Sequence, residues 1–250
     1  MSLLVVEHFY SFQGEGRYAG TPSIFIRLGG CNLGCQGFGV QTPSAKDPSI
    51  MIEGCDSIKA VHNEHFAHLW EKVDSLIPLI MIHLQDLDFK PDIVITGGEP
   101  LLHYENSILL EALKHFIKQG YRVTFETNAS IMIDFEKYPL YKEVTFAMSV
   151  KLENSGEEKK KRLNPLAIKA IVENTKESFF KFVLSKDSLS ETEIKEISKG
   201  LDTPIYCMPM GSTAKELAKN DKAVANFCIQ KGYNYVDRMH IRLWDNEEGR

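Results

Sequence analysis

The chain has 250 residues, of which 43% are hydrophobic and 25% charged, and its formal net charge is -5. This balance supplies a sizeable core and fits one domain over residues 1–250, and the negative charge argues against broad, nonspecific binding to nucleic acid. The N-terminus lacks the features of a signal peptide, and no stretch approaches the ~20 apolar residues of a membrane span. We therefore expect a cytoplasmic protein with no direct nucleic-acid or membrane partner.

Strand-like and helix-like stretches alternate along most of the chain. The patterns of apolar residues predict strands over residues 23–28, 92–96, 121–126, 143–149, 178–184 and 204–208. Helical spacing predicts helices over residues 64–87, 106–119, 190–199 and 214–231, and Gly120 stands where a helix C-terminal glycine belongs. Residues 238–244 alternate polar and apolar side chains and predict a final strand. The alternation predicts an α/β fold with a mostly parallel sheet, either open or a partial barrel.

Polar clusters follow several of the predicted strands, at the end where α/β folds place their active sites. These clusters are the cysteines after residues 27–28, the segment 97–100, the segment 126–128 and the segment 149–151. We expect them to meet at one face of the sheet. The charge-rich run over residues 153–162 is interpreted as a solvated loop or helix start.

Five cysteines in a reducing compartment indicate metal or cluster binding rather than a disulfide framework. Cys207 and Cys228 stand in apolar surroundings and are expected to be plain buried thiols. The other three, Cys31, Cys35 and Cys55, can hold a [4Fe-4S] cluster and leave its fourth iron open. They can equally serve zinc, with a fourth ligand supplied by one of the histidines at positions 62, 65 and 68, which also fit a polar helix face.

A glycine motif after a predicted strand favours the cluster. In Gly97-Gly98-Glu99-Pro100, the two glycines let backbone approach a ligand closely, and Glu99 offers an acceptor for a ligand ammonium group. Alone this motif fits any strand-to-helix turn. Together with three upstream cysteines it indicates a cluster with an organic ligand on its open iron.

Motifs spread over nearly the whole chain carry a family resemblance. They cover residues 9–16, 19–22, 25–33, 55–57, 95–102, 126–128, 149–151 and 208–211. With them the sequence resembles the radical S-adenosylmethionine superfamily and, within it, the 7-carboxy-7-deazaguanine synthase family of queuosine biosynthesis, a pathway of tRNA modification. The resemblance implies a partial (β/α) barrel of the radical S-adenosylmethionine type. One departure is clear, because Phe38 stands at the position of the family's third cysteine.

The family's Cys-Asp-Thr triplet returns in this chain as Cys55-Asp56-Ser57, after an inserted loop over residues 36–54. The resemblance therefore implies that Cys31, Cys35 and Cys55 bind a [4Fe-4S] cluster, whose open iron takes S-adenosylmethionine. It also implies a set of residues around that cofactor. They are Gly97, Gly98, Glu99, Asn128, Ser149, Val150, Lys151, Met208, Pro209, Met210 and Gly211.

The family's substrate is 6-carboxy-5,6,7,8-tetrahydropterin, which is converted to 7-carboxy-7-deazaguanine with ring contraction and loss of ammonia. The matching pocket positions are Phe12, Gln13, Gly14, Arg27 and Thr96. Arg27 suits a carboxylate because its planar fork bonds both oxygens, although a structural ion pair is the alternative. Glu15 suits pterin ring nitrogens or local backbone amides. Ser57 matches a threonine that binds Mg²⁺, a cation that prefers oxygen ligands.

Further expectations come with the resemblance. The family implies a homodimer and a reductant of the flavodoxin or ferredoxin type. The polar residues of the predicted strand over 238–244 either close over the substrate or belong to a plain edge strand. The alternative functions are a glycyl-radical-activating protein, which shares the cluster and the Gly-Gly-Glu-Pro motif, and a zinc-stabilised binding protein that is not an enzyme.

Overall fold

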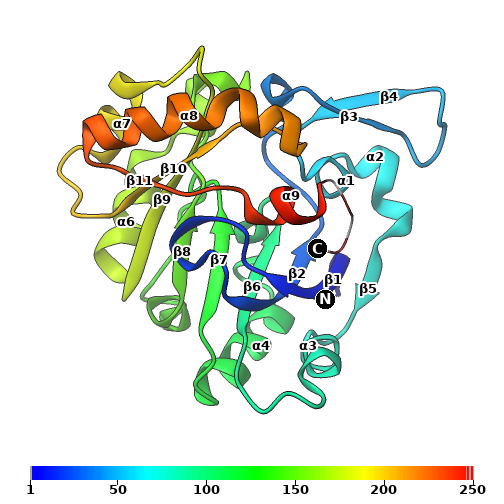
Figure 1. The fold of residues 1–250 in the computed structure, drawn as a ribbon. Helices are drawn as coiled ribbons and strands as arrows, with labels where there is room; N and C mark the ends of the chain where they lie inside the picture. Colours follow the sequence, from blue (N-terminus) through cyan, green and yellow to red (C-terminus); the bar gives the residue numbers. More distant parts are fainter. Residues whose placement is uncertain (1, 246, 248, 250) are drawn as a thin grey trace.

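The computed structural model describes residues 2–245, 247 and 249, and most of its strands form one large sheet (Figure 1). In sheet order, these strands are β11 (Asn234–Tyr235), β10 (Ile205–Pro209), β9 (Glu177–Leu184), β8 (Thr145–Met148), β7 (Val123–Thr127), β6 (Asp92–Gly97), β2 (Pro22–Leu28), β1 (Leu3–Phe12) and β5 (Glu71–Val73). Neighbours from β11 to β2 pair in parallel, whereas β1 pairs antiparallel with β2 and β5. In the described part of the chain the sheet ends at β11 and β5, so it is open. The expected α/β fold with a mostly parallel sheet is confirmed.

Helices cover the sheet and fill the connections between its strands. They are α1 (Ile58–Val61), α2 (Asn63–Phe66), α3 (Ile77–Leu84), α4 (Ser107–Lys118), α5 (Lys159–Arg162), α6 (Pro165–Asn174), α7 (Glu191–Ser198), α8 (Ala214–Lys231) and α9 (Met239–Trp244). The long α8 crosses over β10, and α9 lies in front of the sheet (Figure 1). The Met239 N–H of α9 donates to the Gly14 carbonyl in the loop after β1. In the described residues, no helix has the length and apolar character needed to cross a bilayer.

The core forms where apolar side chains of the central strands meet the helices. Every residue of β6 and β8 is buried. Helix α4 packs on β7 through a stripe at helical spacing, which includes Leu109, Leu113 and Phe116. The Asn106 side chain caps its N-terminus by accepting from the Ile108 N–H, and Gly120 follows its end with φ +77°. The helix and its terminal glycine are as the sequence predicts.

The predicted helix over residues 64–87 is wrong. Helix α2 ends at Phe66, strand β5 covers Glu71–Val73, and α3 begins only at Ile77. Pro78 has no N–H for a helix interior, so it occupies the first turn of α3. Strand β5 instead pairs with β1 and buries Val73, so the sheet overrides the helical spacing.

The predicted final strand over residues 238–244 is also wrong, because Met239–Trp244 form helix α9. Its backbone bonds run from the Arg242 N–H to the Arg238 carbonyl and from the Asp245 N–H to the Ile241 carbonyl. The alternation of polar and apolar residues over one and a half turns does not exclude a helix. Ile241 turns inward, and the Trp244 ring stacks on Phe12 with centroids 6.2 Å apart.

The inserted loop over residues 36–54 forms a hairpin that projects from the body of the molecule (Figure 1). Its strands, β3 (Val40–Pro43) and β4 (Met51–Gly54), pair antiparallel in a sheet of their own. A 3₁₀ turn over Gln36–Phe38 connects Cys35 to the hairpin. The hairpin returns the chain to Cys55, which lies beside the strand ends.

Candidate functional site

A cavity of about 1140 Å³ lies at the carboxyl ends of β2, β6, β7 and β8. Most residues that the sequence singled out line this cavity. They are Phe12, Gln13, Gly14, Glu15, Arg27, Cys31, Cys35, Cys55, Ser57, Thr96, Gly97, Gly98, Asn128, Ser149, Lys151, Met210 and Gly211. The expectation that the polar clusters meet at one face of the sheet is therefore confirmed.

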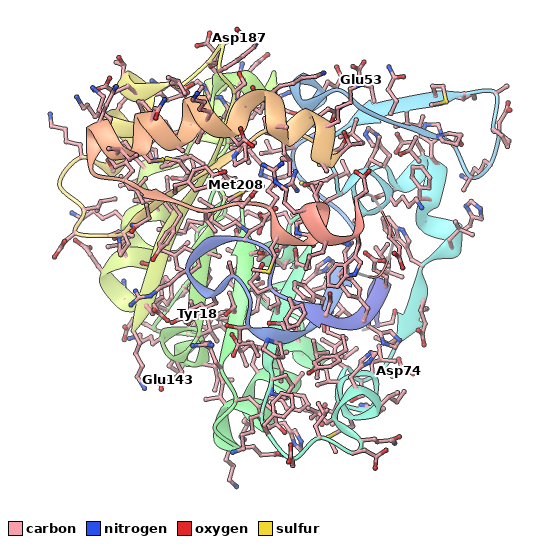
Figure 2. The ribbon with its side chains drawn as sticks, in the orientation of Figure 1. Tyr18, Glu53, Asp74, Glu143, Asp187 and Met208 are labelled. Carbon is pink, nitrogen blue, oxygen red and sulfur yellow. The ribbon has the colours of Figure 1, made fainter. Side chains whose placement is uncertain are left out.

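Four of the expected cofactor residues do not line the cavity. Val150 and Met208 are 2% and 0% exposed, and Pro209 is buried at the end of β10. Figure 2 shows Met208 in the interior, below α8 in that view, whereas Glu53 of the hairpin lies at the outside. The fourth, Glu99, follows the end of β6 and is 0% exposed, so it does not reach the cavity. In this structure these side chains support the site from the core.

The three cysteines expected to bind a cluster line one cavity, Cys31 and Cys35 from the loop after β2 and Cys55 from the turn after β4. They are free thiols, and Cys35 is only 2% exposed. Burial raises the pKa of the Cys31 and Cys35 thiols to about 12 and also raises the pKa of Cys55. Cys55 adds to the rise in pKa at both Cys31 and Cys35, and Asp56 adds to the rise at Cys55. Buried thiols become thiolate ligands beside a cationic metal centre, and iron-sulfur clusters are held by cysteine thiolates. The donor set therefore fits an iron-sulfur cluster.

The histidines of the zinc alternative stay outside the cavity, although His62 Nε2 lies 3.5 Å from the position that a Cβ on Gly54 would take, next to Cys55. His65 Nδ1 lies 3.0 Å from Ser44 Oγ, and His62 lies beside Glu64. Neither these two histidines nor His68 line the cavity that the cysteines share. The segment from α1 to residue 69 is broken into short turns, so the three histidines do not form the face of one helix.

The two glycines of the Gly-Gly-Glu-Pro motif pack against the cysteine loop. A Cβ on Gly97 would lie 2.2 Å from the Leu28 carbonyl oxygen, and one on Gly98 would lie 2.3 Å from the Gly30 carbonyl oxygen and 2.7 Å from Cys31 Cβ. Both glycines still expose backbone to the cavity. The close approaches that require glycine here are to the Leu28 backbone at Gly97, and to the Gly30 backbone and the Cys31 side chain at Gly98.

Glu99 is completely buried, and its carboxylate bonds to its own chain. One oxygen accepts from the Leu101 N–H at 2.9 Å and the Thr127 hydroxyl at 2.7 Å, and the other accepts from the Asn128 N–H at 2.7 Å. Burial raises the pKa of Glu99, and these bonds oppose the rise. Glu99 thus fixes the end of β7 and places Asn128 in the cavity wall.

A cluster of charged side chains, built on the buried Lys181 and Arg238, forms another wall of the cavity. The Lys181 ammonium, 3% exposed, lies 2.9 Å from Glu15 Oε2 and 2.8 Å from Glu126 Oε1. The Arg238 guanidinium lies 2.7 Å from Glu15 Oε1 and 2.5 Å from Asp56 Oδ2. Burial by itself lowers the pKa of Lys181, but the Glu126 and Glu15 carboxylates outweigh it and hold that pKa above its ordinary range. Glu15 therefore bonds to two cations.

Arg27 faces the cavity beside Ser57. Its Nε donates to Glu7 Oε1 at 2.7 Å, and its Nη1 donates to Ser57 Oγ at 3.2 Å. The ion pair with Glu7 is therefore present, and part of the guanidinium still lines the cavity. Nearby, the Thr96 hydroxyl donates to Glu126 Oε2 at 3.1 Å.

Sequence reasoning missed Lys181 in the cavity wall. Asp56 and Glu126 stand in motifs that the sequence singled out, and Arg238 and His240 belong to residues 238–244, whose polar side chains were one alternative for closing over the substrate; all four line the cavity. Lys181 had a signal, because a lysine inside the apolar strand β9 needs a buried partner. His240 belongs to the helix that replaced the predicted strand. A Cβ on Gly14 would lie 2.0 Å from His240 Nδ1, so that position accepts only glycine in this arrangement.

The run over residues 153–162 is not simply a solvated segment. Arg162 is 4% exposed, and its Nη1 donates to the Lys151 carbonyl at 2.8 Å. The Glu157 carboxylate accepts from the N–H groups of Gly34 and Cys35. A charge-rich run is usually solvated. Here Glu157 and Arg162 instead bond to backbone beside the site, so part of the run packs against it.

Comparisons with known proteins agree on one family. No protein-family model matches the chain. A 7-carboxy-7-deazaguanine synthase of Halobacterium salinarum is 31% identical over 264 residues, which cover 98% of this chain and 91% of that protein. A protein of the same name from Rhodopirellula baltica is 29% identical over 262 residues, with 99% and 89% covered.

The fold has a solved counterpart. The crystal structure of QueE from Escherichia coli matches with a TM-score of 0.65 and 21% identity, and the match covers 96% of this chain and 95% of that one. These comparisons give no support to a glycyl-radical-activating protein or a zinc-stabilised binding protein. The cavity, the motifs and the nearly full-length identity of 31% together show that the chain belongs to the 7-carboxy-7-deazaguanine synthase family.

Proposed function

We propose that this chain converts 6-carboxy-5,6,7,8-tetrahydropterin to 7-carboxy-7-deazaguanine, with ring contraction and release of ammonia, on the route to queuosine. The observation that carries the proposal is the meeting of three thiols and the strand-end motifs in one cavity. At about 1140 Å³ this cavity exceeds the usual ~300–1,000 Å³ of a single-ligand pocket, so it has room for a cofactor and a substrate.

Cys31, Cys35 and Cys55 would hold a [4Fe-4S] cluster. When bound, the cluster and S-adenosylmethionine supply a carbon-centred radical able to abstract hydrogen from a substrate. Lys151 would offset the negative charge of the thiolates, because its ammonium lowers the pKa of both Cys35 and Cys55 against the larger effect of burial. It lies 3.0 Å from Ser149 Oγ, which fixes both side chains in the cavity wall.

S-adenosylmethionine would lie along the ends of β6, β7 and β8. Backbone at Gly97 and Gly98, the Asn128 amide and the Ser149 hydroxyl line this part of the cavity. Asn128 is held in place, because its Nδ2 donates to Asn32 and its Oδ1 accepts from Ser130. Met210 and Gly211 would line the adenine from β10. Prearranged polar groups limit the entropy lost on binding.

The pterin would lie against the charged wall. The Glu15 and Glu126 carboxylates suit the N–H groups of a pterin ring, and Gln13 Nε2 lies 3.3 Å from Glu126 Oε1. Arg27 would bond the substrate carboxylate. Phe12 and Gly14 would complete this end, beside Trp244 and His240 of α9, which covers the cavity.

The proposal includes Mg²⁺ beside Ser57. Ser57 Oγ is one hard oxygen ligand in the cavity wall, next to Arg27, and the substrate carboxylate and waters would supply the others. In the described residues, no group of three His, Cys, Asp or Glu side chains is arranged to hold a metal ion. The proposal also includes a homodimer, a flavodoxin- or ferredoxin-type reductant and a cytoplasmic location, which rest on the family alone.

An anaerobic assay tests the proposed function. The protein is reconstituted with iron and sulfide and incubated with S-adenosylmethionine, dithionite and 6-carboxy-5,6,7,8-tetrahydropterin. We expect 7-carboxy-7-deazaguanine to form, with ammonia released in equal amount. Controls omit one component at a time. A protein with a full cluster that cleaves S-adenosylmethionine but leaves the pterin unchanged would contradict the proposed substrate while preserving the cofactor assignment.

A further inference from the structure

The carboxylate of Glu157, in the 153–162 run, accepts hydrogen bonds from the backbone amides of Gly34 and Cys35. Glu157 Oε1 accepts from the Gly34 N–H at 2.5 Å and from the Cys35 N–H at 2.9 Å. Successive N–H groups that converge in this way form a concave anion site, of the kind that holds phosphates and iron-sulfur clusters in other proteins. Here the anion in that site is a side chain of the same chain.

The backbone at Cys35 has an unusual conformation that these bonds stabilise. Cys35 has φ 49° and ψ 46°, the left-handed region that non-glycine residues rarely adopt. The inserted hairpin begins directly after it, so Cys35 lacks the short loop that joins the second and third cysteines in the related family. The hydrogen bonds to the Glu157 carboxylate are charge-assisted. They can stabilise the left-handed backbone at Cys35 even though a long insertion follows it.

The segment that carries Glu157 is itself anchored. Arg162 Nε donates to the Glu157 carbonyl at 3.1 Å, and its guanidinium lies 2.5 Å from Glu193 of α7. The segment also fits closely against the cysteine loop, because a Cβ on Gly37 would lie 2.3 Å from the Asn154 carbonyl oxygen. Glu157 is therefore placed on a rigid support and not on a free loop.

We propose that Glu157 is a positioning residue for the cluster. Its carboxylate holds Cys35 in the conformation of a cluster ligand and lowers the reduction potential of the cluster. The inference rests on the proposed function, since it needs a cluster on Cys31, Cys35 and Cys55. Two effects have the same sign. The carboxylate would place a negative charge beside the cluster, and it accepts from two N–H groups that would otherwise be free to donate to cluster sulfur. Both disfavour the additional electron of the reduced cluster.

The test is a redox titration of the reconstituted full chain, with the reduced cluster quantified by electron paramagnetic resonance. Glu157→Gln retains an acceptor oxygen but removes the charge. We expect the ratio of reduced to oxidised cluster at a fixed potential to rise about tenfold, a shift of about 59 mV for one electron. Glu157→Asp keeps the charge and should stay closer to wild type. The matched control is Glu158→Gln, because the Glu158 side chain is 60% exposed and pairs with Lys160 at the surface.

A second measurement tests the inference if the Glu157→Gln variant assembles too little cluster for a redox titration. Amide hydrogen exchange at Gly34 and Cys35 should be about tenfold faster in Glu157→Gln than in wild type or Glu158→Gln, because the acceptor charge is lost. If the Glu157→Gln cluster has the same reduction potential as wild type, or if hydrogen exchange at these two amides is unchanged, the inference about Glu157 is overturned. The proposed function is not affected by either result. A wild-type chain that assembles no [4Fe-4S] cluster overturns the proposed function together with the inference.

Discussion

Arg238 Nε donates to Glu15 Oε1 at 2.7 Å and thereby joins the loop after the first strand to the residue that precedes the last helix. Both side chains are largely buried, with 8% and 14% of their surfaces exposed. The pair closes the cavity wall, because Arg238 also bonds Asp56 and the Gly211 carbonyl. Any change in this group affects both the stability of the fold and the shape of the site.

Replacing Lys181 with Met should destabilise the protein strongly. The variant leaves Glu15 and Glu126 without the cation that neutralises them, and breaking a buried ion pair in this way costs about 3–5 kcal/mol. Urea unfolding of wild type and variant measures the difference. The control is Lys186→Met, at an exposed lysine beyond the end of the same strand. Equal losses in the two variants would contradict a special role for the buried ammonium.

The stability of the protein should fall in acid partly because of Glu15. Burial raises its pKa, but Lys181 and Arg238 outweigh burial and hold the pKa well below the ordinary 4.5. The unfolded chain therefore binds the proton more readily, so the contribution of Glu15 is complete above pH 4.5 and is lost as the pH falls through the lower folded-state value.

This pH dependence is measured by urea unfolding between about pH 7 and about pH 3. Stability of Glu15→Gln should decline less steeply in acid than that of wild type, because Gln does not titrate. Glu53→Gln, on the exposed face of the hairpin, should follow wild type. A Glu15 variant with the wild-type slope would show that other carboxylates cause the acid loss.

Replacing Cys55 with Ala should prevent assembly of a full [4Fe-4S] cluster, because one of three thiolate ligands is missing. Iron and sulfide content after anaerobic reconstitution measures this loss. Cys207→Ala is the matched control, since Cys207 is 0% exposed in the core and is not in the cavity wall. A full cluster in the Cys55 variant would remove Cys55 from the ligand set.

Gly98→Ala should lower the iron content as well, although it removes no ligand. The added Cβ would lie 2.7 Å from Cys31 Cβ and 2.3 Å from the Gly30 carbonyl oxygen, so the Cys31 loop must move. Gly39→Ala adds the same methyl group to the segment between Cys35 and Cys55, where no atom of the described residues beyond its chain neighbours lies within 4 Å of the new Cβ, so only its backbone at φ +66° opposes the change. Equal iron content in both variants would show that the loop tolerates displacement.

Replacing Arg27 with Lys should lower turnover of the pterin by ~10-fold or more, because Lys keeps the charge but lacks the fork that bonds both carboxylate oxygens. Cleavage of S-adenosylmethionine without product should survive. Both products are measured in one anaerobic reaction. Arg17→Lys provides the control, since Arg17 is 44% exposed and pairs with Glu177 away from the cavity. If the Arg27 variant loses both pterin turnover and cleavage of S-adenosylmethionine, Arg27 contributes to cofactor binding or to folding and not to binding the substrate carboxylate.

The sequence by itself determined the features that depend on local patterns. Apolar runs placed the parallel strands β2 and β6 to β10, helical spacing placed α4, α7 and α8, and short motifs identified the family. These signals are readable because neighbouring residues share one strand or one helix face. The same reasoning failed where the sheet outcompeted helical spacing at β5 and where a short alternation folded as α9.

Only the tertiary structure decided which charged side chains pair with one another across the site. Arg238 bonds a carboxylate 223 positions away, and the Cys35 N–H bonds one 122 positions away. Lys181 stands in an apolar strand, and its partners come from the ends of β7 and β1. A buried charge is tolerated only next to an opposite charge, and no local pattern reports which distant segment supplies it, because that choice is made when the sheet and its covering helices pack together.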